Sequence, residues 1–99
     1  TPLAYPQGAP QITSRITVFP PGSETPMHRH PMPLYVFILE GELTQAAEGK
    51  EPLRYKAGDA FIETGEWHVG RNESDKPLRL LSVYAGADHL PLSEVKPAA

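Results

Sequence analysis

Short segments rich in apolar and β-branched residues recur along this chain, and alternation within residues 12–19 places Ile12, Ile16 and Val18 on one face. Alternation of this kind is typical of β-strands that bury one face. No apolar pattern with helical spacing continues over three turns without a proline or glycine, so we expect almost no helix. The segments that we expect to form strands are residues 12–19, 27–30, 34–40, 43–47, 53–55, 60–62, 67–70 and 78–85.

Prolines and glycines separate these segments and predict turns between them, as Pro20-Pro21-Gly22 does after the first. Many short strands within 99 residues predict one all-β domain, a sandwich or a barrel. We place the domain at residues 12–85. The flanking residues keep no sustained period, so we expect an extended N-terminal arm at residues 1–11 and an irregular C-terminal tail at residues 86–99.

Charge and hydropathy exclude two classes of partner. The nine Lys and Arg residues are scattered singly and the formal net charge is −3, so no basic cluster is available for nucleic acid. The longest apolar run, Leu34 to Leu39, is far shorter than the roughly 20 residues of a membrane-spanning helix. We therefore expect a soluble protein without a membrane partner.

The chain has no cysteine, which excludes disulfides and thiolate chemistry but is compatible with any compartment. It begins with Thr1 rather than methionine, so we expect that an upstream segment has been removed. Whether the protein is cytoplasmic or periplasmic depends on that segment.

Two of the four histidines, His28 and His30, lie two residues apart among several prolines. On a strand, this spacing points both imidazoles to one face with their α-carbons roughly 6.5 Å apart. That arrangement suits two ligands of one metal ion, and the prolines stiffen the backbone around it. A lone histidine is more often a surface residue, and this is what we expect of His89 in the tail.

His68 completes a pattern that resembles the cupin superfamily. The first cupin motif, G-x5-H-x-H-x3,4-E-x6-G, and the second, G-x5-P-x-G-x2-H-x3-N, are both recognisable, although Thr64 replaces the proline and the second motif is one residue shorter. The matching residues are Gly22, His28, His30 and Gly41 in the first motif and Gly58, His68 and Asn72 in the second, with Gly65 near its internal glycine.

The resemblance implies a β-barrel or jelly-roll sandwich with a metal ion bound by His28, His30 and His68. The glutamate of the first motif falls at position 34, where this chain has Leu34, and the side chain of Tyr35 is turned away by alternation. We therefore expect three neutral imidazoles, no carboxylate ligand, and an ion that keeps its full charge.

Further residues around the histidines also have expected roles. We expect an apolar pocket, lined by Leu34, Val36, Ile38 and Phe61, for a small-molecule ligand. The glycines of the motifs are expected in turns with positive φ, Asn72 in a loop cap, and Trp67 in packing away from the site. Three glutamates near the histidines are expected to be solvated turn charges, with the alternative that one acts as a mobile acid or base: Glu24, Glu63 and Glu66.

Within the cupins, a site of three histidines resembles iron dioxygenases that act on diketones or thiols. The resemblance thus favours one Fe(II) ion and a dioxygenase-like enzyme, although imidazole ligands also suit Zn, Ni, Mn or Cu. Two alternatives stay open: a non-enzymatic module that binds or senses a small ligand, and an isomerase or lyase with Zn or Mn as Lewis acid. No catalytic residue is assigned. Because small cupins commonly pair, we also expect a homodimer.

Overall fold

The computed structural model describes residues 5–98, and within this range the chain is built from β-strands with no helix. It therefore holds no helix there that is long and apolar enough to span a membrane. The strands are β1 (Pro10–Phe19), β2 (His28–Arg29), β3 (Leu34–Glu40), β4 (Glu42–Ala47), β5 (Leu53–Lys56), β6 (Ala60–Glu63), β7 (His68–Arg71), β8 (Leu78–Ala87) and β9 (Glu94–Val95). The prediction of an all-β fold is confirmed.

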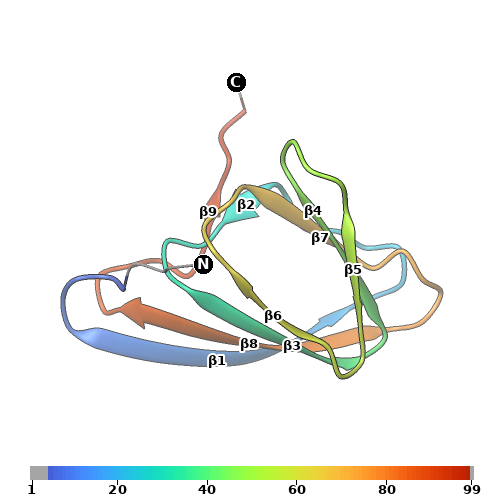
Figure 1. The fold of residues 1–99 in the computed structure, drawn as a ribbon, viewed down its shortest axis with the longest axis horizontal. Helices are drawn as coiled ribbons and strands as arrows, with labels where there is room; N and C mark the ends of the chain where they lie inside the picture. Colours follow the sequence, from blue (N-terminus) through green and yellow to red (C-terminus); the bar gives the residue numbers. More distant parts are fainter. Residues whose placement is uncertain (1–4, 99) are drawn as a thin grey trace.

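The strands form two antiparallel sheets that face each other (Figure 1). One sheet has the order β1-β8-β3-β6 and the other the order β5-β4-β7-β2-β9. Alternation turns Leu34, Val36 and Ile38 of β3 inward, where they pack against β8 and against Leu43 of β4. These apolar side chains fill part of the space between the sheets, and the imidazoles lie beside them.

The register of the four-stranded sheet places two inward-facing rows of residues across β3. Leu34 lies opposite Tyr84 of β8 on one side and opposite Glu63 of β6 on the other. Val36 similarly lies between Ser82 and Phe61. Directly opposed residues send their side chains to the same face of a sheet, so polar groups of β6 and β8 share the interior with the aliphatic side chains of β3.

The outer face of the same sheet is unusually apolar. Ile12, Ile16 and Val18 of β1 are exposed there, together with Tyr35 of β3 and Ile62 of β6. Antiparallel sheets that face water on one side normally carry polar residues on that side. We call these five residues the outer apolar face.

The strands around the histidines differ from the prediction. The expected strand at residues 27–30 is reduced to His28–Arg29, because the nearby prolines, Pro26 and Pro31, have no amide hydrogen to donate. The tail expected to be irregular contains β9, which pairs with β2 through His28 and Arg29. Pro10 and Gln11, expected in the arm, belong to β1, while residues 1–4 lie outside the described range.

Two motif positions are structural, as expected. Gly41 has φ 85° and a β-carbon there would lie 2.5 Å from the Pro77 carbonyl oxygen, so the turn requires glycine. The Asn72 side chain is buried, and it donates to the Phe19 and Lys76 carbonyls. Asn72 therefore holds the loop between β7 and β8 together and takes no part in the metal site.

Candidate metal centre

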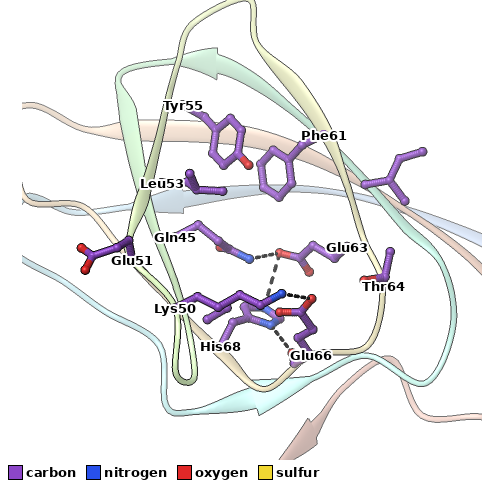
Figure 2. A pocket seen from close by; sticks show the side chains of 12 residues that line it. Gln45, Lys50, Glu51, Leu53, Tyr55, Phe61, Glu63, Thr64, Glu66 and His68 are labelled. Atoms are coloured by element: carbon purple, nitrogen blue, oxygen red, sulfur yellow. Dashed lines mark hydrogen bonds and ion pairs between the residues drawn. The ribbon is translucent and has the colours of Figure 1, made fainter. Parts of the chain in front are cut away.

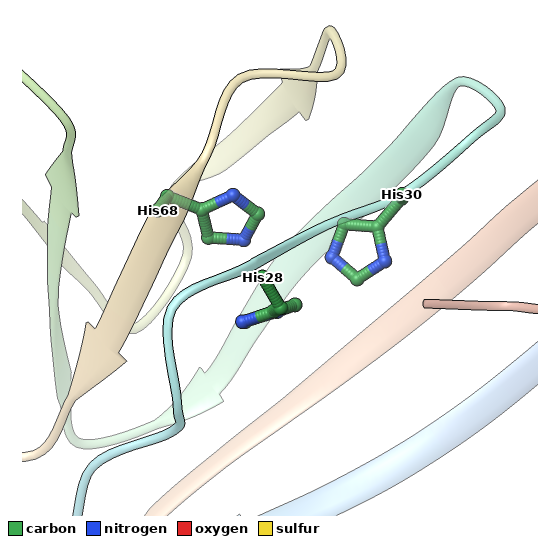
Figure 3. A group of neighbouring side chains, drawn as sticks. All are labelled: His28, His30 and His68. Atoms are coloured by element: carbon green, nitrogen blue, oxygen red, sulfur yellow. The ribbon is translucent and has the colours of Figure 1, made fainter. Parts of the chain in front are cut away.

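The three predicted histidines converge on one point between the sheets. His28 lies on β2, His30 directly follows it, and His68 begins β7, in register opposite His28. Figure 3 shows the three rings around a common space. One ligand nitrogen from each ring lies within 4.8 Å of the others, and both His30 and His68 are buried.

Each imidazole is oriented by a backbone carbonyl. A carbonyl oxygen only accepts, so each Nδ1 must carry the hydrogen, and in the neutral ring the Nε2 lone pair is left free. This arrangement is the usual second layer of support for metal-binding histidines. The three bonds run from His28 Nδ1 to Pro26 O (2.8 Å), from His30 Nδ1 to Leu92 O (2.9 Å) and from His68 Nδ1 to Glu66 O (2.8 Å).

A carboxylate that we had expected in solvent borders these nitrogens. Glu63 ends β6 with its side chain only 10% exposed; Oε2 lies 3.0 Å from His30 Nε2 and Oε1 lies 3.4 Å from His68 Nε2. Gln45 donates a 2.6 Å hydrogen bond to Oε1, as Figure 2 shows. The expectation of a solvated turn charge was wrong for Glu63. Alternation from Phe61, had it been continued by two residues, would have pointed Glu63 inward.

Burial and charge act in opposite directions on these groups. Burial lowers the pKa of His28 below its ordinary value, and repulsion from the other imidazoles adds to the effect. Burial also acts to lower the pKa of His30, but its contacts with Glu63 and Leu92 outweigh burial and raise that pKa. Burial would raise the pKa of Glu63, yet the neighbouring imidazoles, led by His30, hold it below its ordinary value. Glu63 is therefore a carboxylate at neutral pH.

The residues present fit one transition metal ion. Three imidazoles offer Nε2 lone pairs toward one point, their tautomers are fixed by hydrogen bonds, and the pKa of His28 favours the neutral form that binds metal. His28, His30 and His68 would hold the ion from the side of the five-stranded sheet. The metal itself is not specified by these ligands.

The histidines open into a cavity of about 180 Å³ between the sheets. Of the predicted pocket residues, Leu34 and Val36 line this cavity. Phe61 lines a neighbouring cavity of about 160 Å³, shown in Figure 2, where it stacks on Tyr55 at 4.0 Å between ring centroids. Ile38 lines neither cavity, since it is fully buried in the apolar core. The two cavities share Gln45, Glu63 and His68 as walls.

The cavity beside the histidines is more polar than the apolar pocket we expected. Arg15 and Thr17 of β1 and Ser82 of β8 line it together with the aliphatic side chains. Arg15 lies in register opposite Ser82, on the inward-facing row that continues to Val36. In the described part of the chain Arg15 forms no ion pair with a carboxylate, unlike Arg29, which pairs with Glu94. Arg15 is an exposed residue, so its guanidinium is available both to solvent and to an anionic ligand.

Two other candidate residues lie apart from the site. The Arg29 guanidinium carbon lies 4.4 Å above the centre of the Trp67 ring, so Trp67 packs against charged side chains away from the cavity, as predicted. His89 is exposed, with Nδ1 3.7 Å from Asp88 Oδ1. Neither residue lines the cavity beside the histidines.

Comparison with known proteins gives one family and several related structures. Residues 15–84 match the family model described as the Cupin domain. No curated protein matches the sequence. Among solved structures, the DMSP lyase DddQ from Ruegeria pomeroyi is 29% identical with a TM-score of 0.74, over 86% of this chain and 43% of that chain.

Two further similar structures support the fold alone. A cupin-like protein from Thermotoga maritima is 23% identical with a TM-score of 0.77, over 88% of this chain and 65% of that one. An oxalate decarboxylase from Bacillus subtilis is 22% identical with a TM-score of 0.71, over 85% of this chain and 23% of that one. The present chain thus spans less than two thirds of the length of each of these three proteins.

Proposed function

This chain belongs to the cupin family, and we propose that it is a mononuclear metal enzyme that cleaves a small carboxylate substrate without consuming oxygen. The single observation that supports a metal ion is the orientation of the three histidines. Hydrogen bonds to backbone carbonyls turn their three Nε2 lone pairs toward one point. The proposed ion is one divalent transition metal. When bound, it would act as a Lewis acid that polarises a substrate oxygen.

The cavity limits the size of the substrate. At about 180 Å³ it is smaller than the roughly 300 to 1,000 Å³ of pockets for drug-sized ligands. Bulky aromatic compounds such as flavonols are therefore poor candidates. Substrates of a few heavy atoms suit the space.

Arg15 supports a carboxylate as the anchoring group. A guanidinium binds a carboxylate through two parallel hydrogen bonds, and Arg15 lines the cavity without an internal partner among the described residues. A small acid held there extends from the four-stranded sheet toward the histidines on the opposite sheet. Arg15 thus orients the substrate, and the aliphatic side chains of Leu34 and Val36 limit the water beside it.

The choice of a lyase over an oxygenase follows from two observations. The expectation of an Fe(II) dioxygenase depended on a site without a carboxylate, but Glu63 borders the imidazoles. In addition, the DMSP lyase is 29% identical to this chain. We keep the Fe(II) dioxygenase as the second candidate, because three histidines with open coordination positions also suit it.

One experiment separates these functions. Protein purified without chelators is first analysed for metals, and then loaded anaerobically with Fe(II), Mn(II), Zn(II), Ni(II) or Cu(II). Turnover is assayed on small carboxylates including DMSP, and on small thiols and diketones, in an oxygen electrode. Product formation without oxygen uptake supports the lyase. Turnover that depends on oxygen supports the dioxygenase, and ligand binding without turnover by any metal form supports a binding or sensing module.

We also propose that the protein is a homodimer joined through the outer apolar face. Five large apolar side chains are exposed on one side of the four-stranded sheet. Exposed apolar residues gathered on one face of a sheet are typical of an interface between proteins rather than of a solvated sheet.

The domain is proposed to extend beyond residues 12–85. β1 begins at Pro10, and the carbonyl of Leu92 accepts the hydrogen bond that orients His30. A chain limited to residues 12–85 lacks that support.

A further inference from the structure

The position of Glu63 in the sheet bears directly on the missing glutamate of the first motif. That motif places its glutamate where this chain has Leu34, and in the ladder between β3 and β6 the residue directly opposite Leu34 is Glu63. Opposed residues of antiparallel strands lie about 4.5 to 5.5 Å apart and send their side chains to the same face. A carboxylate at position 63 therefore enters the interior beside the place where one at position 34 would.

The distances from the Glu63 oxygens to the histidine nitrogens match the separation of two atoms that bind one metal ion. Ligand atoms bound at about 2.1 Å lie about 3.0 Å apart when adjacent in an octahedron and about 3.4 Å apart in a tetrahedron. Glu63 Oε2 is 3.0 Å from His30 Nε2, and Oε1 is 3.4 Å from His68 Nε2. Both oxygens thus lie at the separation of neighbouring ligands.

The carboxylate is also held in place with one oxygen unsatisfied. Gln45 donates to Oε1, whereas Oε2 is buried and makes no hydrogen bond of good geometry. Its one charged neighbour among the described residues is His30 Nε2 at 3.0 Å, and burial of a charged oxygen that accepts no well-formed hydrogen bond is costly. A cation at the point shared by the imidazoles removes this cost.

We propose that Glu63 is the fourth protein ligand of the metal ion, supplied by β6 in place of the glutamate that the first cupin motif carries on β3. This inference depends on the metal site of the proposed function and adds a ligand to it. The site then consists of three imidazoles from the five-stranded sheet side and one carboxylate from the opposite sheet. The carboxylate halves the charge of a divalent ion, and a site of nitrogen and oxygen ligands suits Mn, Fe, Ni or Zn.

The test is a Co(II) titration followed by visible absorption, with Zn(II) affinity measured by competition against a chelating dye. We expect Glu63→Gln to weaken both affinities by about 100-fold or more, beyond the 10- to 100-fold typical of groups that only orient a ligand. We also expect the Co(II) spectrum to change. Glu42→Gln, which removes the same charge from an exposed site on β4, should change neither affinity nor spectrum.

The outcomes separate this inference from the proposed function. If Glu63 only pairs with His30, then Glu63→Gln leaves the affinity unchanged or raises it, and the proposal is overturned while the three-histidine site stands. A weaker affinity with an unchanged Co(II) spectrum also overturns the proposal, since Glu63 then only orients the histidine ligands and does not bind the ion. A wild-type chain that binds no metal overturns both.

A second variant decides the matter if Glu63→Gln does not fold. The double variant Leu34→Glu with Glu63→Leu returns the carboxylate to the opposite strand of the same ladder. Recovery of Co(II) affinity to within about 10-fold of wild type supports the interchange of the two positions. A folded double variant that does not bind Co(II) overturns it.

Discussion

Arg15 and the three histidines line one cavity and have different proposed roles in it. The imidazoles are turned toward one point by the Pro26, Leu92 and Glu66 carbonyls, whereas Arg15 reaches the same space from β1. In the proposed function, the histidines hold the metal ion and Arg15 orients the substrate beside it. A substitution at Arg15 separates these two properties.

We predict that Arg15→Gln raises KM for a carboxylate substrate by about 10- to 100-fold, because it removes a charged hydrogen bond worth about 1.5 to 3 kcal/mol. Metal affinity, measured by Co(II) titration, should be unchanged. Arg79→Gln is the matched control, since Arg79 is exposed on β8 opposite Val18. Equal KM values for wild type and Arg15→Gln would show that the substrate does not use this guanidinium.

At the level of single residues, the histidines were predictable and the carboxylate was not. His28, His30 and His68 have a spacing that few other residues share, so their convergence followed from two motifs. Glu63 lies at the end of a strand next to a turn, and glutamates in turns are usually solvated. Alternation from Phe61 gives the inward direction of its side chain, but its contact with the histidines depends on the long-range pairing of β6 with β3.

Among the elements, the two-residue strand β9 supports the histidine-bearing part of the chain. It pairs with β2, and the residues just before it, Leu92 and Ser93, lie against His30 Nδ1 at 2.9 and 3.2 Å. The short strand that carries the histidines is thus supported on both edges, by β7 and by β9.

A chain that ends at residue 90 is predicted to bind metal about 10- to 100-fold more weakly, because His30 loses the carbonyl that orients it. The barrel strands should remain, as judged by circular dichroism. A chain that ends at residue 96 keeps β9 and serves as the control. Undiminished Zn(II) affinity in the shorter chain would contradict this role of the tail.

The accuracy of the strand predictions varied with the strength of their patterns. β3 was predicted to its terminal residues because it is apolar and ends at a glycine, Gly41. β9 has only two residues between prolines and presents no period that a sequence pattern detects. The expected strand at residues 27–30 was too long, since the prolines around it limit its pairing to one residue of β7 and two residues of β9.

On the scale of the whole molecule, the two motifs predicted a barrel that encloses a metal site, and the family match and the two sheets bear out that fold. Composition alone did not reveal how the apolar residues divide between the interior and the outer apolar face. That division depends on which face of each strand the partner sheet covers. It became visible only with the register of β1 and β8.

We predict that metal removal lowers the midpoint of thermal unfolding. An ion present at 100 times its Kd stabilises the folded chain by about 2.7 kcal/mol. For a domain of this size, each kcal/mol corresponds to about 4 to 8 °C, so the holo protein should unfold at least about 10 °C above the apo protein. Differential scanning calorimetry with and without Zn(II) measures this difference, and coincident transitions would indicate that no ion is bound.

Ile16→Lys should convert the proposed dimer into a monomer, because Ile16 is 59% exposed on the outer apolar face and a lysine buried in an interface without a partner is unfavourable. Sedimentation velocity distinguishes the 10.9 kDa chain from its dimer. Leu53→Lys, at an equally exposed apolar residue of the other sheet, should leave the dimer intact. If the wild type sediments only as a monomer at micromolar concentration, the outer apolar face is not a self-association surface.

The hydrogen bond from Gln45 to Glu63 joins β4 of the five-stranded sheet to β6 of the four-stranded sheet, beside the histidines. This link between the sheets affects the rate at which a bound ion is released. With Glu63 bound to the ion as well, the two sheets cannot separate until the metal bonds break, so release of the ion becomes a step of barrel opening. At a pH where chemical exchange is faster than reclosing of the barrel, amide hydrogens of β6 and β7 should then exchange at one common rate that matches the rate at which the ion leaves.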